Sequence, residues 1–206
     1  MKKILPILTI SLLIFGFYLN KANAEGYAVS GHNIILDAGH GGDDPGTTQC
    51  PGLYEKTANL DIAFKLKKLL EDAGATVYMT REDDSTLSNE ARYTYANTTD
   101  AEVLLSIHLN GSTDHSVNGT KGLYSKPKKD KAFTSAVHIN MNEDLGVKDL
   151  GMTNFMSGVI LKFLRPATIQ ESVYLSNTQE CEKFKAGTRA GEVAQALFNG
   201  LNNWFE

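Results

Sequence analysis

The sequence predicts an α/β protein with a single domain, in which a mostly parallel twisted sheet is flanked by helices. Short apolar runs rich in β-branched residues alternate along the chain with longer segments whose apolar residues recur at helical spacing. This alternation is typical of parallel sheets with helical crossovers. The 206 residues are 42% hydrophobic and 21% charged, which fits one domain with an ordinary core.

The N-terminal segment differs from the rest of the chain. Two lysines precede an apolar run over residues 4–19, and the polar stretch after this run ends in Ala-Asn-Ala. This order is typical of a secretory signal peptide, with an uncleaved N-terminal anchor as the alternative. We expect residues 1–24 to be the signal peptide and residues 25–206 to be the functional domain. The mature protein is then secreted to the periplasm or the cell wall.

The predicted mature domain is acidic. Removal of residues 1–24 takes away three lysines and no acid, which leaves 17 basic and 24 acidic residues and a net charge of −7. Nucleic-acid binding usually selects a basic surface, so this balance argues against nucleic acid as the main partner.

The first half of the domain contains three predicted strands and two helices. Residues 32–38 indicate a buried strand that runs into a glycine-rich loop. Residues 58–73 carry apolar side chains at helical spacing, and Gly74 supplies a stop. A strand over 75–81 follows. A short helix over 87–97 has Ser88 as its N-cap, and an apolar strand covers 102–110.

The second half completes the alternation. An added strand is predicted over 122–125, and a helix over 130–146 ends at a glycine. Residues 167–177 begin as a strand, and residues 190–205 form an amphipathic closing helix. Residues 142–163 have an irregular composition, and we hypothesise that they border the cleft and set its specificity.

Three chemically active side chains occur near predicted strand ends. His40 lies in the loop LDAGHGG, His108 ends an apolar run, and Glu171 lies within the strand that follows Pro166. Ligands in parallel sheets collect beyond the carboxyl ends of strands. These positions therefore converge on one candidate site.

Common catalytic and nucleotide-binding motifs are missing from the sequence. The glycines around His40 do not form G-x-G-x-x-G, and neither a G-x-x-x-x-G-K-[ST] loop nor a G-x-S-x-G elbow occurs. The cysteines, Cys50 and Cys181, either form a disulfide in the exported protein or remain free thiols.

Metal binding is the chemistry that the histidines favour. Of five histidines, only His40 and His108 lie in loops at strand ends; His32, His115 and His138 are expected at the surface or on a helix. Imidazole is the commonest side-chain ligand of zinc, and a catalytic zinc site has three protein ligands. Because no H-E-x-x-H motif occurs, such ligands must come from distant segments.

The chain resembles the zinc-dependent N-acetylmuramoyl-L-alanine amidases, which cleave bacterial peptidoglycan. The resemblance covers nearly all of residues 33–205, in matching order. Its segments are IILDAGHGGDDPGT (34–47), LYEKTANLDIAFKLKKLLEDAGATVYMTREDD (53–84), LSNEARYTYAN (87–97), LLSIHLNG (104–111) and PATIQESVYLSN (166–177).

This resemblance implies a complete site. It makes His40, Glu55 and His108 the zinc ligands, and it makes Glu171 the acid/base that moves a proton from water to the leaving amine. The scissile bond is then the amide between the lactyl group of muramic acid and L-alanine. The chain departs from the family at Val173, where glycine is usual, so the resemblance does not define the shape of the cleft there.

Several other polar residues are candidates for supporting roles. Asn110 orients His108, binds substrate or serves a turn, and Asp37 is a candidate partner for a ligand imidazole. Arg165 meets a peptide carboxylate or lies at the surface. The sequence assigns Asp83 and Asp84 to a solvated loop. It assigns three aromatic residues to packing rather than to sugar binding: Tyr93, Tyr95 and Phe155.

Three functions remain open from the sequence. The first is a secreted, monomeric zinc amidase acting on peptidoglycan or soluble muropeptides. The second is a zinc peptidase that cleaves within the stem peptide, and the third is a non-catalytic wall-binding protein. No wall-binding repeat is visible, so targeting depends on the domain itself or on a partner protein, which also leaves an activator open.

Overall fold

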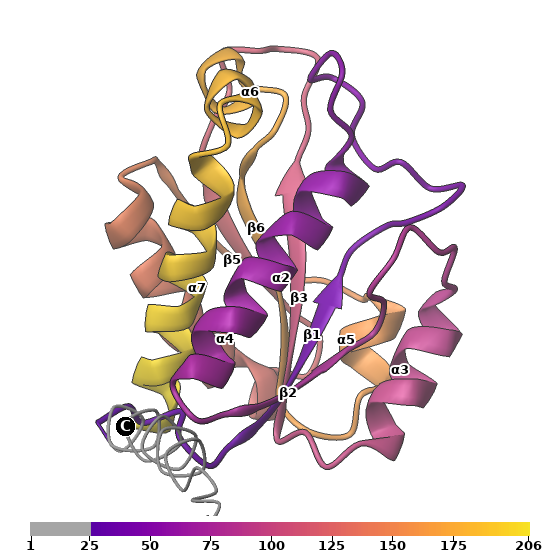
Figure 1. Cartoon of the computed structure of the whole chain (residues 1–206), viewed down its shortest axis with the longest axis vertical. Helices are drawn as coiled ribbons and strands as arrows, with labels where there is room; N and C mark the ends of the chain where they lie inside the picture. Colours follow the sequence, from indigo (N-terminus) through magenta and orange to yellow (C-terminus); the bar gives the residue numbers. More distant parts are fainter. Residues whose placement is uncertain (1–25) are drawn as a thin grey trace, which may run out of the picture.

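A six-stranded sheet lies at the centre of the molecule, with strand order β2-β1-β3-β6-β4-β5 (Figure 1). The structure, a computed structural model, describes residues 26–206, so the predicted signal peptide lies outside the described residues. The strands are β1 (Asn33–Ala38), β2 (Thr76–Met79), β3 (Val103–Asn110), β4 (Thr120–Tyr124), β5 (Asp149–Asn154) and β6 (Ala167–Tyr174).

The sheet is mostly parallel, as predicted. Strands β2, β1, β3 and β6 run in one direction. Strand β4 pairs antiparallel with β6, and β5 pairs parallel with β4. The carboxyl ends of the four parallel strands therefore share an edge of the sheet with the beginning of β4. This edge is the upper one in Figure 1.

Helices cover both faces of this sheet. The helices are α2 (Glu55–Asp72), α3 (Asn89–Thr98), α4 (Pro127–Leu145), α5 (Gly158–Lys162), α6 (Thr178–Lys185) and α7 (Arg189–Phe205). Buried apolar residues of α2, α4 and α7 form a large core with one sheet face, and those of α3 and α5 form a smaller core with the other. Helix α6 lies beyond the upper edge of the sheet (Figure 1).

Strand periodicity assigns the residues of β3 to these two faces. Leu105 and Ile107 belong to the large core, whereas Leu104 belongs to the small one. Because successive side chains alternate across a sheet, Ser106 and His108 share the face of Leu104. The small α3/α5 layer does not extend over His108, which is partly exposed at the edge of the sheet.

Several predicted element ends are confirmed. The hydroxyl of Ser88 accepts a hydrogen bond from the backbone N–H of Ala91 at 3.1 Å and caps α3. Gly146 adopts a left-handed conformation, with φ of 61°, and ends α4. Helix α2 begins three residues earlier than the apolar spacing predicts, and the additional first turn contains Glu55.

Three elements were absent from the sequence-based prediction. Strand β5 is an edge strand with mostly exposed or half-buried residues, so it lacks a clear apolar alternation. Helix α5 has only five residues, and α6 is rich in charge. Residues 142–163 therefore contain regular structure, namely the end of α4, β5 and α5.

A disulfide fixes the loop that precedes α2. Cys50 and Cys181 are both buried and bonded, with their Cα atoms 5.5 Å apart and a sequence separation of 131 positions. This bond resolves the two alternatives that the sequence left open. It attaches the loop over 46–54 to α6.

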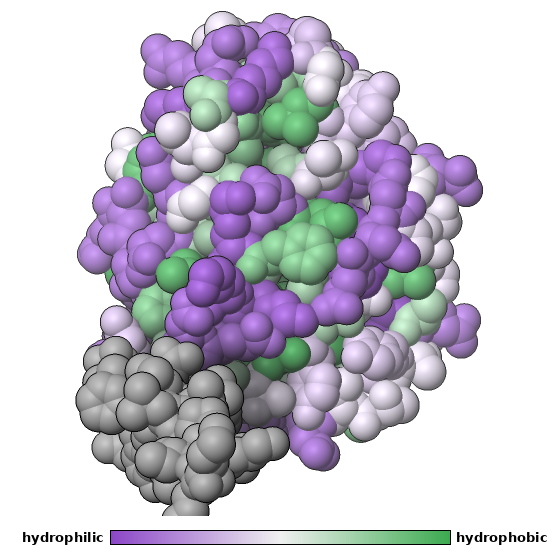
Figure 2. Space-filling model, in the orientation of Figure 1, coloured by the Kyte–Doolittle hydropathy of each residue, from purple (hydrophilic) through white to green (hydrophobic). Residues whose placement is uncertain are grey.

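The face of the molecule that α2 and α7 cover is mixed in polarity. Figure 2 shows hydrophilic side chains over most of this face and hydrophobic ones in separate patches. Within residues 26–206, no helix combines the length and apolar character that crossing a membrane requires.

Candidate functional site

The structure brings together the three residues that the resemblance named as ligands. His40 follows β1, Glu55 begins α2, and His108 lies near the end of β3. One ligating atom from each residue lies within 4.8 Å of the other two, a spacing at which one metal ion can contact all three. The sequence separation of these residues hides the cluster, which only the fold assembles.

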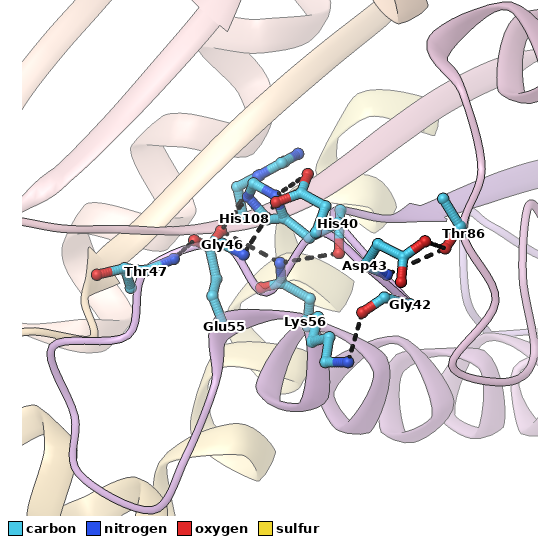
Figure 3. A network of polar contacts seen from close by, with 12 residues as sticks. His40, Gly42, Asp43, Gly46, Thr47, Glu55, Lys56, Thr86 and His108 are labelled. Carbon is cyan, nitrogen blue, oxygen red and sulfur yellow. Dashed lines mark hydrogen bonds and ion pairs between the residues drawn. The ribbon is translucent and has the colours of Figure 1, made fainter.

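Glu55 is the centre of this cluster (Figure 3). Its Oε1 lies 3.1 Å from Nε2 of His40 and 3.2 Å from Nδ1 of His108. Backbone N–H groups hold the same carboxylate: Thr47 donates to Oε2 at 2.8 Å and Leu109 to Oε1 at 3.0 Å. As the first residue of α2, Glu55 also lies at the positive end of the helix dipole.

Glycine is required where the loop passes these side chains. A Cβ atom on Gly39 would lie 2.3 Å from the ring of His108, and one on Gly46 would lie 2.5 Å from Oε2 of Glu55. His40 itself has φ of 60°, a left-handed conformation that is uncommon for a residue with a side chain. Gly39 and Gly46 therefore leave room for the side chains of His108 and Glu55.

Two buried arginines hold this loop through its carbonyl groups. Arg81 donates to the carbonyl oxygens of Ala38 and Gly39, each at 2.9 Å. Arg92 donates to those of Ala38 at 2.8 Å and His40 at 2.7 Å. Sequence reasoning missed both arginines, because an arginine in a charged loop or a short helix gives no local signal of burial.

The partner of the His40 imidazole differs from the sequence expectation. Asp37 was a candidate for this role, but its carboxylate accepts hydrogen bonds from Thr80, Ser106 and Arg92. Asp44 takes the role instead, with its Oδ2 2.7 Å from Nδ1 of His40. Because Asp37 lies within β1, its side chain projects from the sheet face that α3 covers, where it pairs with Arg92.

The three clustered groups shift the pKa values of one another. Burial lowers the pKa of His40, but the hydrogen bond and charge of Glu55, together with Asp44, outweigh it and raise that pKa to about 9. Burial would raise the pKa of Glu55, yet its hydrogen bonds to His108 and His40 hold it well below the usual range. The carboxylate is therefore ionised, as a metal ligand must be.

Glu171 lies beside the cluster on the next strand. It is the in-register partner of His108 across the β3–β6 pair. Its Oε2 is inaccessible to solvent and has no hydrogen-bond partner within residues 26–206. Burial, together with the charge of Glu55, raises the pKa of Glu171 above its ordinary value. A carboxyl group in this state is suited to accept and release a proton.

A β-bulge follows Glu171 and explains the tolerance of Val173. Three residue steps along β6, from Glu171 to Tyr174, oppose two steps along β3, from His108 to Asn110. The extra residue re-aims the strand, and Val173 is fully buried in the large core. Val173 lines neither cavity at the site.

Two cavities meet at this site. One has a volume of about 410 Å³ and the other about 530 Å³. Both are lined by His40, His108, Asn110 and Glu171. Together they form a cleft with two arms, with the clustered ligands at the junction.

The remaining sequence candidates are distributed as follows. Asn110 lines both arms, and its Oδ1 accepts a hydrogen bond from the N–H of Gly111. Arg165 is wrong as a carboxylate-binding residue, since its guanidinium donates to the carbonyl of Thr99 and lies over the ring of Phe163.

Asp84 and Phe155 both lie in loops outside the helices and strands. Asp84 is exposed, as expected, but pairs with Lys56 at 2.7 Å. Phe155 is half exposed and lines the larger arm, whereas the sequence predicts a packing role for it. Residues 142–163 thus do border the cleft, through Thr153, Phe155, Ser157 and Val159.

The fold and the site together have the parts of a hydrolase: three side chains grouped closely enough to hold one metal ion, an adjacent buried carboxyl group and an open cleft. Residues 34–203 match the family described as N-acetylmuramoyl-L-alanine amidase. The chain belongs to this family.

Known relatives agree with this membership. The chain is 29% identical over 187 residues to N-acetylmuramoyl-L-alanine amidase LytC of Bacillus subtilis, which corresponds to 89% of this chain and 38% of LytC. It therefore spans well under half the length of that relative.

Solved structures of amidases share the fold. The catalytic domain of CwlV from Bacillus (Paenibacillus) polymyxa superposes with a TM-score of 0.79 at 32% identity, covering 84% of this chain and 97% of that one. The CwlD amidase of Clostridioides difficile, solved in complex with the GerS lipoprotein, superposes with a TM-score of 0.78 at 27% identity. This match covers 84% of this chain and 98% of that one.

Proposed function

We propose that this protein hydrolyses the amide bond between the lactyl group of N-acetylmuramic acid and the L-alanine of the stem peptide in peptidoglycan. One observation carries this proposal. His40, Glu55 and His108 converge beside Glu171 at the junction of a two-armed cleft, in a chain of the amidase family. A branched substrate, with glycan on one side of the scissile bond and peptide on the other, fits such a cleft.

Zinc is the metal that we propose for the cluster. Two imidazole nitrogens and one carboxylate oxygen are the donor set of many catalytic zinc sites. When bound, zinc supplies Lewis acidity that polarises the scissile carbonyl and acidifies the attacking water. The donors fit this role because Glu55 is ionised and its hydrogen bonds fix the orientation of the carboxylate.

Glu171 carries the proton in the proposed reaction. Its carboxylate takes a proton from water as the water oxygen attacks the carbonyl carbon. The same carboxyl group then gives this proton to the alanine nitrogen as the C–N bond breaks. The raised pKa of Glu171 supports both steps. A carboxyl group whose pKa lies closer to neutral pH both accepts a proton from water and releases it to the amine more readily.

Export and partners are part of the proposal. We propose that residues 1–24 are removed as a signal peptide and that the mature domain acts outside the cytoplasm on peptidoglycan. Family membership and the disulfide support this localisation, because disulfides persist in oxidising compartments. The CwlD–GerS complex supports a protein partner as a candidate regulator, and we propose a monomeric catalytic domain.

The test combines zinc content with product analysis. We expect the wild type to release stem peptides that begin with L-alanine. Glu171→Gln should retain zinc and lose at least about 1,000-fold in turnover, because the proton carrier is removed. His40→Ala should lose zinc. Products that leave L-alanine on muramic acid would establish the peptidase alternative, and unchanged zinc in His40→Ala would refute the ligand assignment.

A further inference from the structure

Three charged or ionisable side chains form a row across three adjacent strands. His108 on β3 is the in-register partner of Glu171 on β6, and Glu171 is in register with Lys121 on β4. Directly opposed residues of neighbouring strands project their side chains on the same face, about 5 Å apart. Lys121 therefore extends the proposed catalytic row by one strand, into the larger arm of the cleft.

The ammonium group of Lys121 has no assigned partner. Lys121 is half-buried, and its side chain makes no hydrogen bond or ion pair with any residue in the range 26–206. Arg92, the other cation that lines this arm, donates instead to Asp37 and to the loop carbonyls of Ala38 and His40. Lys121 is thus the cation of this arm that remains available to a ligand.

The two arms differ in chemistry. The smaller arm contains no lysine or arginine and presents hydroxyl and amide groups of Thr47, Gln49, Ser112 and Thr113. The larger arm combines Lys121 with apolar side chains, namely Leu87, Leu123, Phe155, Val159 and Ile169. Three other charged residues of this arm already have partners: Asp37 pairs with Arg92, and Asp44 lies 2.7 Å from Nδ1 of His40. Uncharged groups suit the smaller arm, whereas an anionic group joined to an apolar chain suits the larger one.

We propose that the larger arm holds the stem peptide and that Lys121 binds a carboxylate on the residue next to L-alanine. This inference rests on the proposed amidase function. In the scissile amide the lactyl carboxyl is already consumed, so the glycan side is uncharged and the carboxylates near the bond belong to the peptide. A half-buried ammonium without a partner is suited to such a carboxylate.

A different role for Lys121 makes different predictions. As the cross-strand neighbour of Glu171, Lys121 lowers the pKa of that carboxyl group by its charge. A residue that acted only in this way would affect all substrates equally and would shift the pH profile of turnover. A residue that binds a peptide carboxylate affects the affinity for peptides that carry the carboxylate.

The experiment compares two tripeptides, L-alanyl-γ-D-glutamyl-L-lysine with a free α-carboxyl on the glutamate and the same peptide with an α-carboxamide. Their binding to the zinc-loaded protein is measured by calorimetry, together with kcat and KM on the corresponding muramoyl peptides. We expect the wild type to bind the free acid about 10- to 100-fold more tightly, as expected for one charged hydrogen bond.

Matched variants complete the test. Lys121→Met should abolish this preference and Lys121→Arg should retain it, whereas Lys131→Met, a change on the exposed surface of α4, should leave it intact. Equal wild-type binding of the two peptides, or an equal loss on both in Lys121→Met, would overturn the proposal. Because binding is read without turnover, failure of the amidase activity appears separately, as absence of cleavage of both muramoyl peptides.

Discussion

At the scale of single residues, the site depends on close approaches that leave no room for additional atoms. The left-handed conformation of His40 turns its imidazole toward Glu55 while its own carbonyl is held by Arg92. Gly39 lies against the ring of His108. Uncommon backbone conformations of this kind persist only where the surroundings hold them, and here two arginines supply the hold.

Gly39→Ala tests this arrangement. The added methyl group would lie 2.3 Å from the His108 ring, so we expect the ring to be displaced and zinc affinity to fall at least about 10-fold. Gly191→Ala is the matched control, since a Cβ there meets nothing within 4 Å in α7 and should stabilise the helix slightly. Zinc titration and thermal unfolding of both variants measure the two effects. Unchanged zinc affinity in Gly39→Ala would contradict the steric argument.

At the scale of elements, a buried ion pair joins the strands to α3. The Oδ1 of Asp37 on β1 lies 2.8 Å from Nη1 of Arg92 on α3, and its Oδ2 accepts from Ser106 on β3. Arg92 in turn supports the loop that carries His40. Packing of α3 and the position of one proposed ligand are therefore coupled through Asp37.

Asp37→Asn should break this coupling. Removal of the charge leaves the buried guanidinium of Arg92 without its counter-ion, which typically costs about 3–5 kcal/mol. We expect that loss in the free energy of unfolding, measured with urea at pH 7. A loss below about 1 kcal/mol would show that the carbonyl groups around Arg92 suffice.

The same pair predicts an acid dependence. Burial would raise the pKa of Asp37, but the charge of Arg92 and the hydrogen bonds of Ser106 and Thr80 hold it below 3.8. A lowered pKa contributes stability that is complete above about pH 4 and is lost as the pH falls through the folded-state value. The wild type should therefore lose more stability than Asp37→Asn between pH 4 and pH 2. Parallel curves for both proteins would contradict the prediction.

Strong local periodicity made the main elements predictable. Strand β3 and helix α7 are buried over most of their length, so their apolar patterns are clear. Strand β5 and helix α6 are short and partly exposed, and their sequences carry little apolar signal. For the site, the family resemblance named His40, Glu55, His108 and Glu171. Their convergence, and the roles of Asp44 and Arg92, depend on contacts between distant segments that no local pattern encodes.

At the scale of the whole molecule, the disulfide joins two distant parts of the chain. Cys50 lies in the loop that leads to Glu55, and Cys181 lies in α6, the helix that precedes the last helix of the chain. The bond thus restrains the loop that contributes Thr47 and Gln49 to the smaller arm of the cleft.

Removal of this bond should lower stability. Because the cysteines are separated by 131 positions in the sequence, restriction of the unfolded chain is expected to contribute about 3–5 kcal/mol. The double variant Cys50→Ser, Cys181→Ser should show this loss in urea unfolding, and the reduced wild type should behave similarly. The reductant should have no effect on the double variant. Identical unfolding of oxidised and reduced wild type would contradict the prediction.

The reversal of β4 has a consequence for how such an enzyme can diversify. In the parallel strands, the residues at the upper edge of the sheet are those that end the strands and carry the proposed chemistry. Because β4 runs the other way, its beginning lies at this edge, and Lys121 reaches the cleft from a strand that supplies none of the proposed ligands. Under the proposed function, mutation of this strand would alter which wall peptides are accepted while the proposed hydrolytic groups are inherited unchanged.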